Sequence, residues 1–115
     1  MKRIEAIVHS EKITELNEEL KKIGNSGATI YDAKGRGHGE KPMVQSGRGT
    51  GKYTSEFSSR SCLSTVVDDG EVDKIVKAIL DTVSTGSPGD GKIFISTVAE
   101  AIDIGTQKRG NGALE

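Results

Sequence analysis

The sequence predicts an α+β fold, in which a four-stranded antiparallel sheet carries two helices on one face. Three observations lead to this fold: the 115 residues suffice for one domain, a strand–helix–strand pattern occurs twice, and a long glycine-rich stretch separates the two copies. The order β-α-β, loop, β-α-β is that of the ferredoxin-like fold. Because the helices cover one face only, and the other face keeps apolar side chains, we expect the chain to form oligomers.

The first half begins with a predicted strand over residues 2–8, where apolar and polar side chains alternate. Ser10 is the expected N-cap of the helix that follows, and Gly24 is expected to end that helix. Residues 28–34, rich in β-branched and aromatic side chains, predict the second strand. The apolar face of the helix recurs at spacings of three and four residues, at Ile13, Leu16, Leu20 and Ile23.

The second half repeats the pattern with a strand over residues 60–67, a helix, and a strand over residues 92–98. Asp68 and Asp69 are the expected caps of this helix. The last strand is almost continuously apolar, which predicts burial on both faces. After it, we expect a short helical turn at 99–102 and then a mobile tail without regular structure. The helix carries a wide apolar stripe of Val72, Ile75, Val76, Ile79, Leu80 and Val83.

Composition and charge limit the class of protein. The net charge of −1 argues against a dedicated nucleic-acid binder, and a single cysteine, Cys62, fits a reducing compartment. No apolar run approaches the roughly 18 residues of a membrane span, and the first residues lack the apolar core of a signal peptide. We therefore expect a cytoplasmic protein that is not embedded in a membrane.

The residues give little support for catalysis. No H-E-x-x-H, G-x-S-x-G or paired-cysteine motif occurs. His9 and His38 have no cysteine or carboxylate partner at ligand spacing, so they are interpreted as ordinary surface or strand residues. Cys62 is interpreted as a small buried hydrophobe. We expect neither an enzyme nor a metal site.

Phosphate binding is the stronger candidate. The stretch 47–53 (GRGTGKY) fails the Walker A pattern, because Ser46 and Tyr53 replace a required glycine and a required Ser or Thr. In the stretch 85–92 (TGSPGDGK), three glycines allow backbone N–H groups to approach an anion, and Lys92 can add a positive charge. Taken alone, such a stretch is more often a simple turn.

Residues 85–98 (TGSPGDGKIFISTV), together with the opening MKRIEAIV, closely resemble the nitrogen-regulatory PII signal-transduction family, and the resemblance runs essentially end to end. It implies one PII-type domain over 1–115, a homotrimer, a T-loop at 36–59, a B-loop at 85–92 and a C-terminal loop or tail at 102–115. It also implies that ATP or ADP binds in clefts between subunits, with 2-oxoglutarate beside it at the base of the T-loop. The T-loop would regulate an ammonium transporter or enzymes of nitrogen assimilation, and a transporter partner would bring the protein to the membrane.

The resemblance assigns site residues position by position. Arg60 takes the place of a lysine that pairs with the distal carboxylate of 2-oxoglutarate, a task that arginine can perform bidentately. Tyr53 falls where many bacterial members carry a nucleotidylated tyrosine. The implied nucleotide site comprises Thr29, Gly35, Gly37, His38, Val66, Thr85, Gly89, Asp90, Gly91 and Lys92. The implied 2-oxoglutarate site comprises Arg36, Gly37, Gly39, Glu40, Lys41, Arg60 and Gly89.

Several positions depart from the family. Gly39 replaces a glutamine that helps to hold Mg²⁺ and the oxoacid, and His38 replaces an arginine of the nucleotide site. Ser87, Asp103 and Gly105 replace basic residues that grip phosphates. Losing two charge-assisted hydrogen bonds of roughly 1.5–3 kcal/mol each would weaken ATP binding by about a hundredfold or more. We therefore expect an altered dependence on ATP, with the need for Mg²⁺ left open.

Two alternatives remain. Within the same fold, the chain would sense AMP, ADP or another small anion, because fewer phosphate-gripping residues favour fewer phosphates. In a different class, residues 36–60 would bind RNA, because they hold five basic side chains against two acidic ones. The low aromatic content of this stretch disfavours RNA, since bases need rings on which to stack. We expect no nucleic-acid partner.

Overall fold

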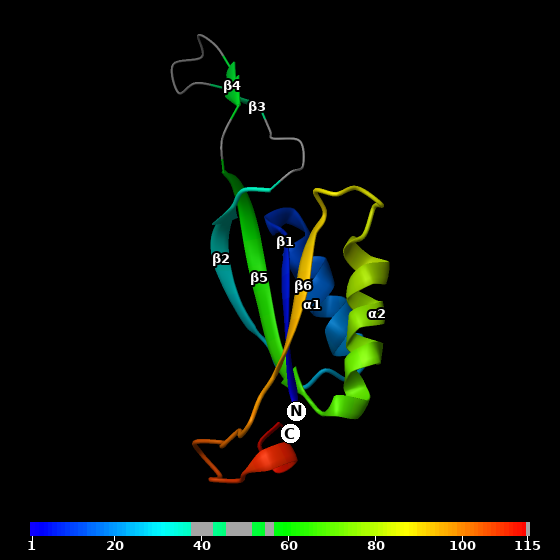
Figure 1. Ribbon diagram of the computed structural model, residues 1–115, viewed down its shortest axis with the longest axis vertical. Helices are drawn as coiled ribbons and strands as arrows, with labels where there is room; N and C mark the ends of the chain where they lie inside the picture. Colours follow the sequence, from blue (N-terminus) through cyan, green and yellow to red (C-terminus); the bar gives the residue numbers. More distant parts are fainter. Residues whose placement is uncertain (38–42, 46–51, 55–56, 115) are drawn as a thin grey trace.

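A computed structural model of the chain describes residues 1–115 except 38–42, 46–51, 55–56 and 115 (Figure 1). The main sheet has the strand order β2-β5-β1-β6, and every neighbouring pair is antiparallel. The predicted ferredoxin-like arrangement is confirmed. Its strands and helices are β1 (Lys2–His9), α1 (Ile13–Lys22), β2 (Thr29–Gly35), β5 (Ser58–Val67), α2 (Val72–Val83) and β6 (Gly91–Thr97).

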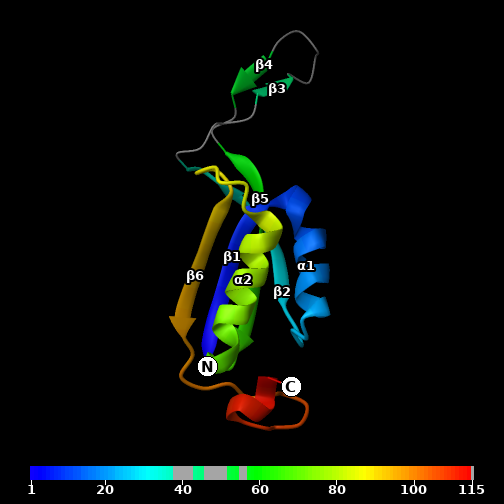
Figure 2. The ribbon, with the colours of Figure 1, turned by 90° about the vertical axis from the view of Figure 1, so that its right-hand side faces the viewer.

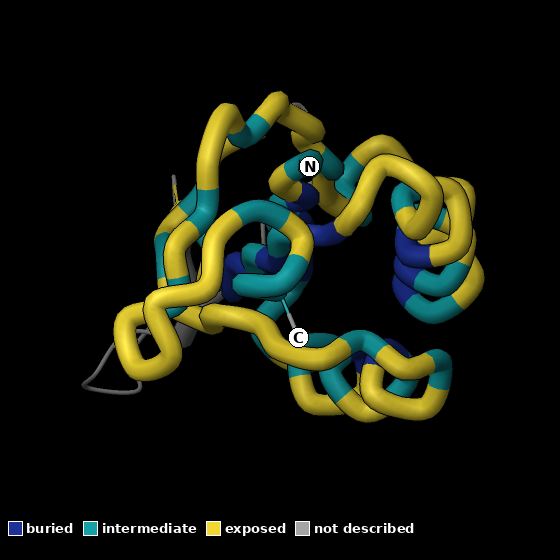
Figure 3. Tube along the Cα trace, turned by 90° about the horizontal axis from the view of Figure 1, so that it is seen from below, coloured by how far each residue is buried: buried dark blue, intermediate teal, exposed yellow. Residues whose placement is uncertain are grey.

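Both helices lie on the same side of the main sheet, as two views at right angles show (Figure 1 and Figure 2). Alternate residues of β1 face the helices, because successive side chains of a strand point to opposite faces. Figure 3 colours buried residues dark blue, and they lie along the inner sides of the helices and central strands. The buried core consists of Ile4, Ala6, Val8, Leu16, Leu20, Leu63, Val67, Ile75, Ile79 and Val83.

The first helix starts differently from the prediction and ends as predicted. Ser10 begins a 3-10 turn, Ser10–Lys12, that leads directly into α1, and neither segment has a side-chain cap. Ser10 is therefore inside the first turn, and its predicted role as N-cap is wrong. Gly24 ends the helix with a φ of +90°, a conformation that favours glycine.

The second helix is preceded by one of its two predicted caps. Asp68 accepts a hydrogen bond from the Gly70 amide at 3.1 Å, at the 3-10 turn that opens into α2. Asp69 instead pairs with the amino group of Met1 at 3.0 Å. The prediction for Asp69 is wrong because its side chain points back toward the start of β1.

The strand β6 lies at the edge of the sheet, and its predicted burial on both faces is wrong. Among the described residues it pairs only with β1. Phe94 and Ile95 are 54% and 49% exposed, and Ile93 alone packs partly against the core. The open face also exposes Tyr31, whereas Cys62 beside it is buried, as predicted. Phe94 lies on the open face and Ile95 on the helix side, so the β6 edge exposes one apolar side chain on each face of the sheet.

The long loop contains more regular structure than its sequence predicts. Two short strands, β3 (Met43–Gln45) and β4 (Lys52–Thr54), pair antiparallel as a separate small sheet. Each strand has only three residues, which are too few for an alternation of apolar and polar side chains to be recognised, and glycines lie close to both strands in the sequence. The ladder is thus short and lies apart from the main sheet (Figure 1).

The tail is also more regular than predicted. No helical turn forms at 99–102, which corrects that expectation, and Ile102 instead bridges to Arg109. A 3-10 helix, Gly110–Leu114, follows. The Ser26 hydroxyl donates to the Leu114 carbonyl at 2.7 Å, so the tail is fastened to the segment before β2.

Candidate functional site

One end of the main sheet collects the root of the long loop and the B-loop (residues 85–92). There β2 ends at Gly35, β5 begins at Ser58, β1 ends at His9 and β6 begins at Gly91. We call this the loop end, and we call the opposite end, where the tail lies, the tail end (Figure 1 and Figure 2). The antiparallel register therefore brings two glycine-rich segments far apart in sequence to one edge of the molecule.

Arg60 and His9 meet at the loop end. The register places Arg60 of β5 opposite His9 of β1 on one side and Ala33 of β2 on the other. Arg60 Nη1 donates to His9 Nδ1 at 3.0 Å and to the Ser59 carbonyl at 3.1 Å. Arg60 and His9 are both partly buried. The arginine that the resemblance assigns to 2-oxoglutarate is thus held in place by the sheet.

His9 extends this contact to the B-loop. Its Nε2 lies 2.8 Å from the Gly89 carbonyl oxygen. An arginine has only donors, so Nδ1 must accept, and the neutral ring carries its proton on Nε2 and donates it to Gly89. Sequence patterns alone miss this role, since they place His9 among ordinary strand residues. The sequence does contain one indication of the contact. His9 directly follows the predicted first strand, and Arg60 begins the predicted third strand, so antiparallel pairing of these two strands would place them opposite each other.

Asp90 shapes the B-loop. Its carboxylate accepts hydrogen bonds from the Thr85 hydroxyl at 2.6 Å, the Thr85 amide at 2.5 Å and the Ser87 amide at 3.3 Å. The hydroxyl and then the amide of Thr85 are the main causes that hold the pKa of Asp90 below its usual value. The structure therefore brings the predicted site residues Thr85 and Asp90 together. The backbone amides of Thr85 and Ser87 donate to the Asp90 carboxylate of the same loop.

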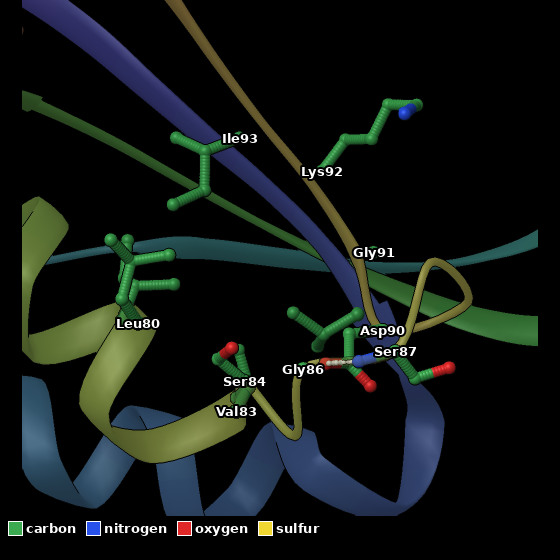
Figure 4. A pocket seen from close by; sticks show the side chains of 11 residues that line it. Leu80, Val83, Ser84, Gly86, Ser87, Asp90, Gly91, Lys92 and Ile93 are labelled. Atoms are coloured by element: carbon green, nitrogen blue, oxygen red, sulfur yellow. Dashed lines mark hydrogen bonds between the residues drawn. The ribbon is translucent and has the colours of Figure 1, made fainter.

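Gly91 joins the B-loop to β1 by close backbone contact. Its φ is +136°, and a Cβ there would lie 2.0 Å from the Ile7 carbonyl oxygen. Only glycine fits this position. The next residue, Lys92, stands opposite Ile7 and points its side chain to the other side of β6 from Ile93 (Figure 4). Lys92 therefore faces the open side of the sheet.

Thr29 and Val66, which the resemblance assigns to the adenine pocket, do line a common pocket of about 370 Å³. Arg3 and Leu114 border it, so it extends toward the tail end. Thr29 begins the edge strand β2 and Val66 lies on its neighbour β5, whereas Lys92 is on β6 at the opposite edge. Within one chain, the structure therefore separates the predicted adenine residues from the predicted phosphate loop.

A second cavity of about 290 Å³ lies between α2 and β6, beside the B-loop (Figure 4). Leu80, Val83 and Ile93 form its apolar wall, with Ser84 and Asp90 among the polar lining residues. Leu80 belongs to the predicted apolar stripe, yet it is 50% exposed because it faces this cavity. No sequence pattern predicts the cavity.

The remaining predicted site residues belong to the long loop. His38, Gly39, Glu40 and Lys41 lie outside the described residues. The backbone of Tyr53 belongs to β4, but its side chain also lies outside what the structure describes. The root residues Arg36 and Gly37 are described and exposed, next to the strand end at Gly35.

No cluster of three or more histidine, cysteine, aspartate or glutamate side chains is placed to hold a metal ion in 1–37, 43–45, 52–54 and 57–114. In the same ranges no helix has both the length and the apolar character needed to cross a membrane.

The fold and the site define a small α+β chain with a candidate ligand site between a glycine-rich turn and the root of a long loop. The sequence profile described as "Nitrogen regulatory protein P-II" matches residues 1–108. Proteins of that name from Rhodospirillum rubrum and Haemophilus influenzae are 39% identical over 114 residues, covering 99% of this chain and 100% of their own. "Nitrogen regulatory protein P-II 2" of Methanothermobacter thermautotrophicus is 37% identical, covering 99% of this chain and 97% of its own. The chain therefore belongs to the nitrogen regulatory protein P-II family.

This membership assigns the chain to nitrogen signalling. The family consists of signalling regulators that act on partners rather than of enzymes. The match covers both halves of the main sheet and the B-loop, and it ends within the tail. The sequence resemblance stated above is thus confirmed at the level of the family.

Proposed function

We propose that the chain is a homotrimeric sensor of nitrogen and carbon status, which binds 2-oxoglutarate and an adenine nucleotide and has an altered dependence on ATP. It acts in the cytoplasm on an ammonium transporter or an enzyme of nitrogen assimilation, through the loop at 36–59. Ligand occupancy at the loop end would select the path of this loop, and the path would decide which partner is bound.

The observation that carries this proposal is the position of Arg60 at the root of the loop. Its side chain packs over Gly35, where a Cβ would lie 3.1 Å from Arg60 Cγ. The guanidinium is turned toward His9 and the B-loop. Charge-assisted pairs between arginine and carboxylate are strong and directional. A dicarboxylate bound here would therefore lie where the strand becomes the loop, so its presence can change the direction in which the loop leaves the sheet.

The separation of the two halves of the nucleotide site supports the trimer. Thr29 and Val66 lie toward one edge of the sheet and Lys92 at the other. The β6 edge also carries the exposed side chains of Phe94 and Ile95, and covering such apolar surface stabilises association. A second copy that covers this edge with its own β2 side would place its Thr29 beside the B-loop of the first.

A second candidate, a sensor of AMP or ADP, is favoured by Asp103. The resemblance implies an arginine here, but Asp103 accepts hydrogen bonds from the Thr106 amide and hydroxyl, each at 2.8 Å. The amide and then the hydroxyl of Thr106 hold the pKa of Asp103 below its usual value, so the carboxylate stays charged at neutral pH. A negative charge in the tail favours a ligand with fewer phosphates.

The test is a calorimetric titration with 2-oxoglutarate, with and without MgATP, on the wild type, Arg60→Gln and Lys21→Gln. We expect Arg60→Gln to weaken 2-oxoglutarate about tenfold or more, since it removes a charge-assisted pair. Lys21, in an exposed pair with Glu18 on α1, is the control and should leave binding unchanged. Sedimentation equilibrium should give three chains per particle. A wild type that binds neither ligand, or that stays monomeric, would contradict the proposal.

A further inference from the structure

Among the described residues, Arg60 has hydrogen-bond partners on one edge of its guanidinium group only. Its Nη1 carries two N–H groups, and these are directed to His9 Nδ1 and to the Ser59 carbonyl. The Nε–H and the Nη2 group form the other edge, whose parallel N–H bonds suit a bidentate carboxylate. The contacts to His9 and to the Ser59 carbonyl thus set the orientation of the guanidinium group.

We propose that His9 is a positioning residue that couples the 2-oxoglutarate site to the B-loop, an inference that rests on the proposed function. Through Nδ1 it orients Arg60, and through Nε2 it holds the Gly89 carbonyl. A carboxylate that pulls on Arg60 shifts the imidazole ring and, with it, the B-loop. A nucleotide that orders the B-loop fixes the ring and therefore Arg60.

The B-loop is built to respond as one piece. Asp90 ties Thr85 and Ser87 together, so the turn is braced across its width. At its end, Gly91 lies against the backbone of Ile7 on the same strand that carries His9. A displacement of the Gly89 carbonyl is therefore passed to the whole loop. Since coupling between two binding sites is reciprocal, either ligand should change the affinity for the other by the same factor.

This path passes through protein groups only. Both His9 contacts join side chain or backbone atoms of the same chain. The sequence has Gly39 where the family resemblance implies a metal-holding glutamine. Coupling through His9 needs no metal ion between the two ligands, so it should persist when ADP is used in the presence of a chelator.

Three variants separate the two hydrogen bonds of His9, the one to Arg60 and the one to the Gly89 carbonyl. His9→Leu removes both contacts. In His9→Asn the amide oxygen can take the place of Nδ1 as acceptor for Arg60, while the bond to Gly89 is lost. In His9→Gln the amide nitrogen can reach the Gly89 carbonyl, while Arg60 loses its acceptor. Lys2→Leu, at the other end of the same strand, is the control, because its side chain contacts only Thr97 among the bonds described.

The experiment measures the 2-oxoglutarate Kd with and without saturating ADP in EDTA, by calorimetry on the trimer. The wild type should show a coupling factor clearly different from one. His9→Leu should weaken 2-oxoglutarate about tenfold and bring the factor to one. His9→Asn should keep the affinity but lose the coupling, and His9→Gln should lose affinity. Lys2→Leu should match the wild type.

A spectroscopic measurement checks the ring itself. The chain has two histidines, His9 and His38, so comparison with His9→Asn assigns the imidazole ¹⁵N signals of His9. They should show the Nε2–H tautomer in the free protein, as the bonds to Arg60 and Gly89 require. The opposite tautomer, or a coupling factor unchanged in His9→Leu, overturns the inference and leaves the proposed function standing. A wild type that binds neither ligand overturns both.

Discussion

The loop end of the main sheet and the tail are held by different kinds of contact. At the loop end, partly buried hydrogen bonds run from Arg60 to His9 and on to Gly89, and they join β5, β1 and the B-loop. The side-chain hydrogen bonds of the tail itself are exposed. Asp103–Thr106 lies within one turn, whereas Ser26–Leu114 and Asn111–Asp68 fasten the tail to segments far away in sequence.

The difference shows where a binding event can be transmitted. A bond that links two strands and a loop cannot change without moving all three, whereas an exposed turn can open by itself. Partly buried hydrogen bonds to charged groups also contribute more than exposed ones, since water competes less well for their partners. We therefore expect substitutions at the loop end to alter stability and ligand response together, and substitutions in the exposed turns of the tail to alter neither strongly.

The largest effect is expected for Gly91→Ala. The new Cβ would lie 2.0 Å from the Ile7 oxygen at a φ of +136°, which should lower the free energy of unfolding by about 2 kcal/mol or more. Gly86→Ala, with a φ of +83° and open space around it, is the control and should lose about 1 kcal/mol. Urea unfolding of both variants checks this. Equal losses would show that contact with β1 does not set the cost at the loop end.

A smaller effect is expected for Asp90→Asn. Because hydrogen bonds from Thr85 hold the pKa of Asp90 below its usual value, the carboxylate stabilises the B-loop above the ordinary aspartate pKa. This contribution is lost as the pH falls through the lower, folded pKa. Amide chemical shifts of residues 85–90 should therefore change at acidic pH in the wild type. They should change little in Asp90→Asn, and an identical pH response in both proteins would contradict the bracing role of Asp90.

The smallest effect is expected at the tail end, for Asp103→Asn. The carboxylate accepts from Thr106 within one exposed turn, so its loss should open that turn and leave the midpoint of urea unfolding almost unchanged. The sign of its pH dependence is the same as for Asp90, because the pKa of Asp103 is also lowered. If Asp103→Asn lowered the free energy of unfolding as much as Gly91→Ala, the expected difference between the tail and the loop end would be wrong.

Local patterns predicted most of the fold. The periodic apolar residues of α1 and α2, the stop at Gly24 and the alternation in β1 depend on short-range geometry, so the sequence contains them directly. The edge position of β6 does not depend on short-range geometry. The sequence of an apolar strand is the same whether residues of its own chain or of another copy cover it. Helical spacing likewise cannot distinguish a core contact from a cavity wall, so the apolar stripe of α2 does not reveal that Leu80 borders a cavity.

The family resemblance assigns the glycines of the B-loop and Arg60 to the candidate site, and the structure places them at one end of the sheet. Their roles in binding stay predictions. The contacts of His9 are not predictable from sequence patterns, because they depend on strand register. Pairing of β5 with β1 places Arg60 opposite His9, and the B-loop then brings the Gly89 carbonyl next to the imidazole ring. Such a contact involves residues 51 and 80 positions away in sequence, beyond the reach of spacing rules.

The position of Thr29 and Lys92 at opposite edges of one sheet has a genetic consequence. If neighbouring copies build each nucleotide site together, a chain defective at Thr29 and a chain defective at Lys92 each fail alone. Mixed in one cell, they would form hybrid rings in which some interfaces combine the two intact halves. Two inactive alleles would then restore a partial response when expressed together. Conversely, one variant chain would disable a nucleotide site that it shares with a wild-type neighbour.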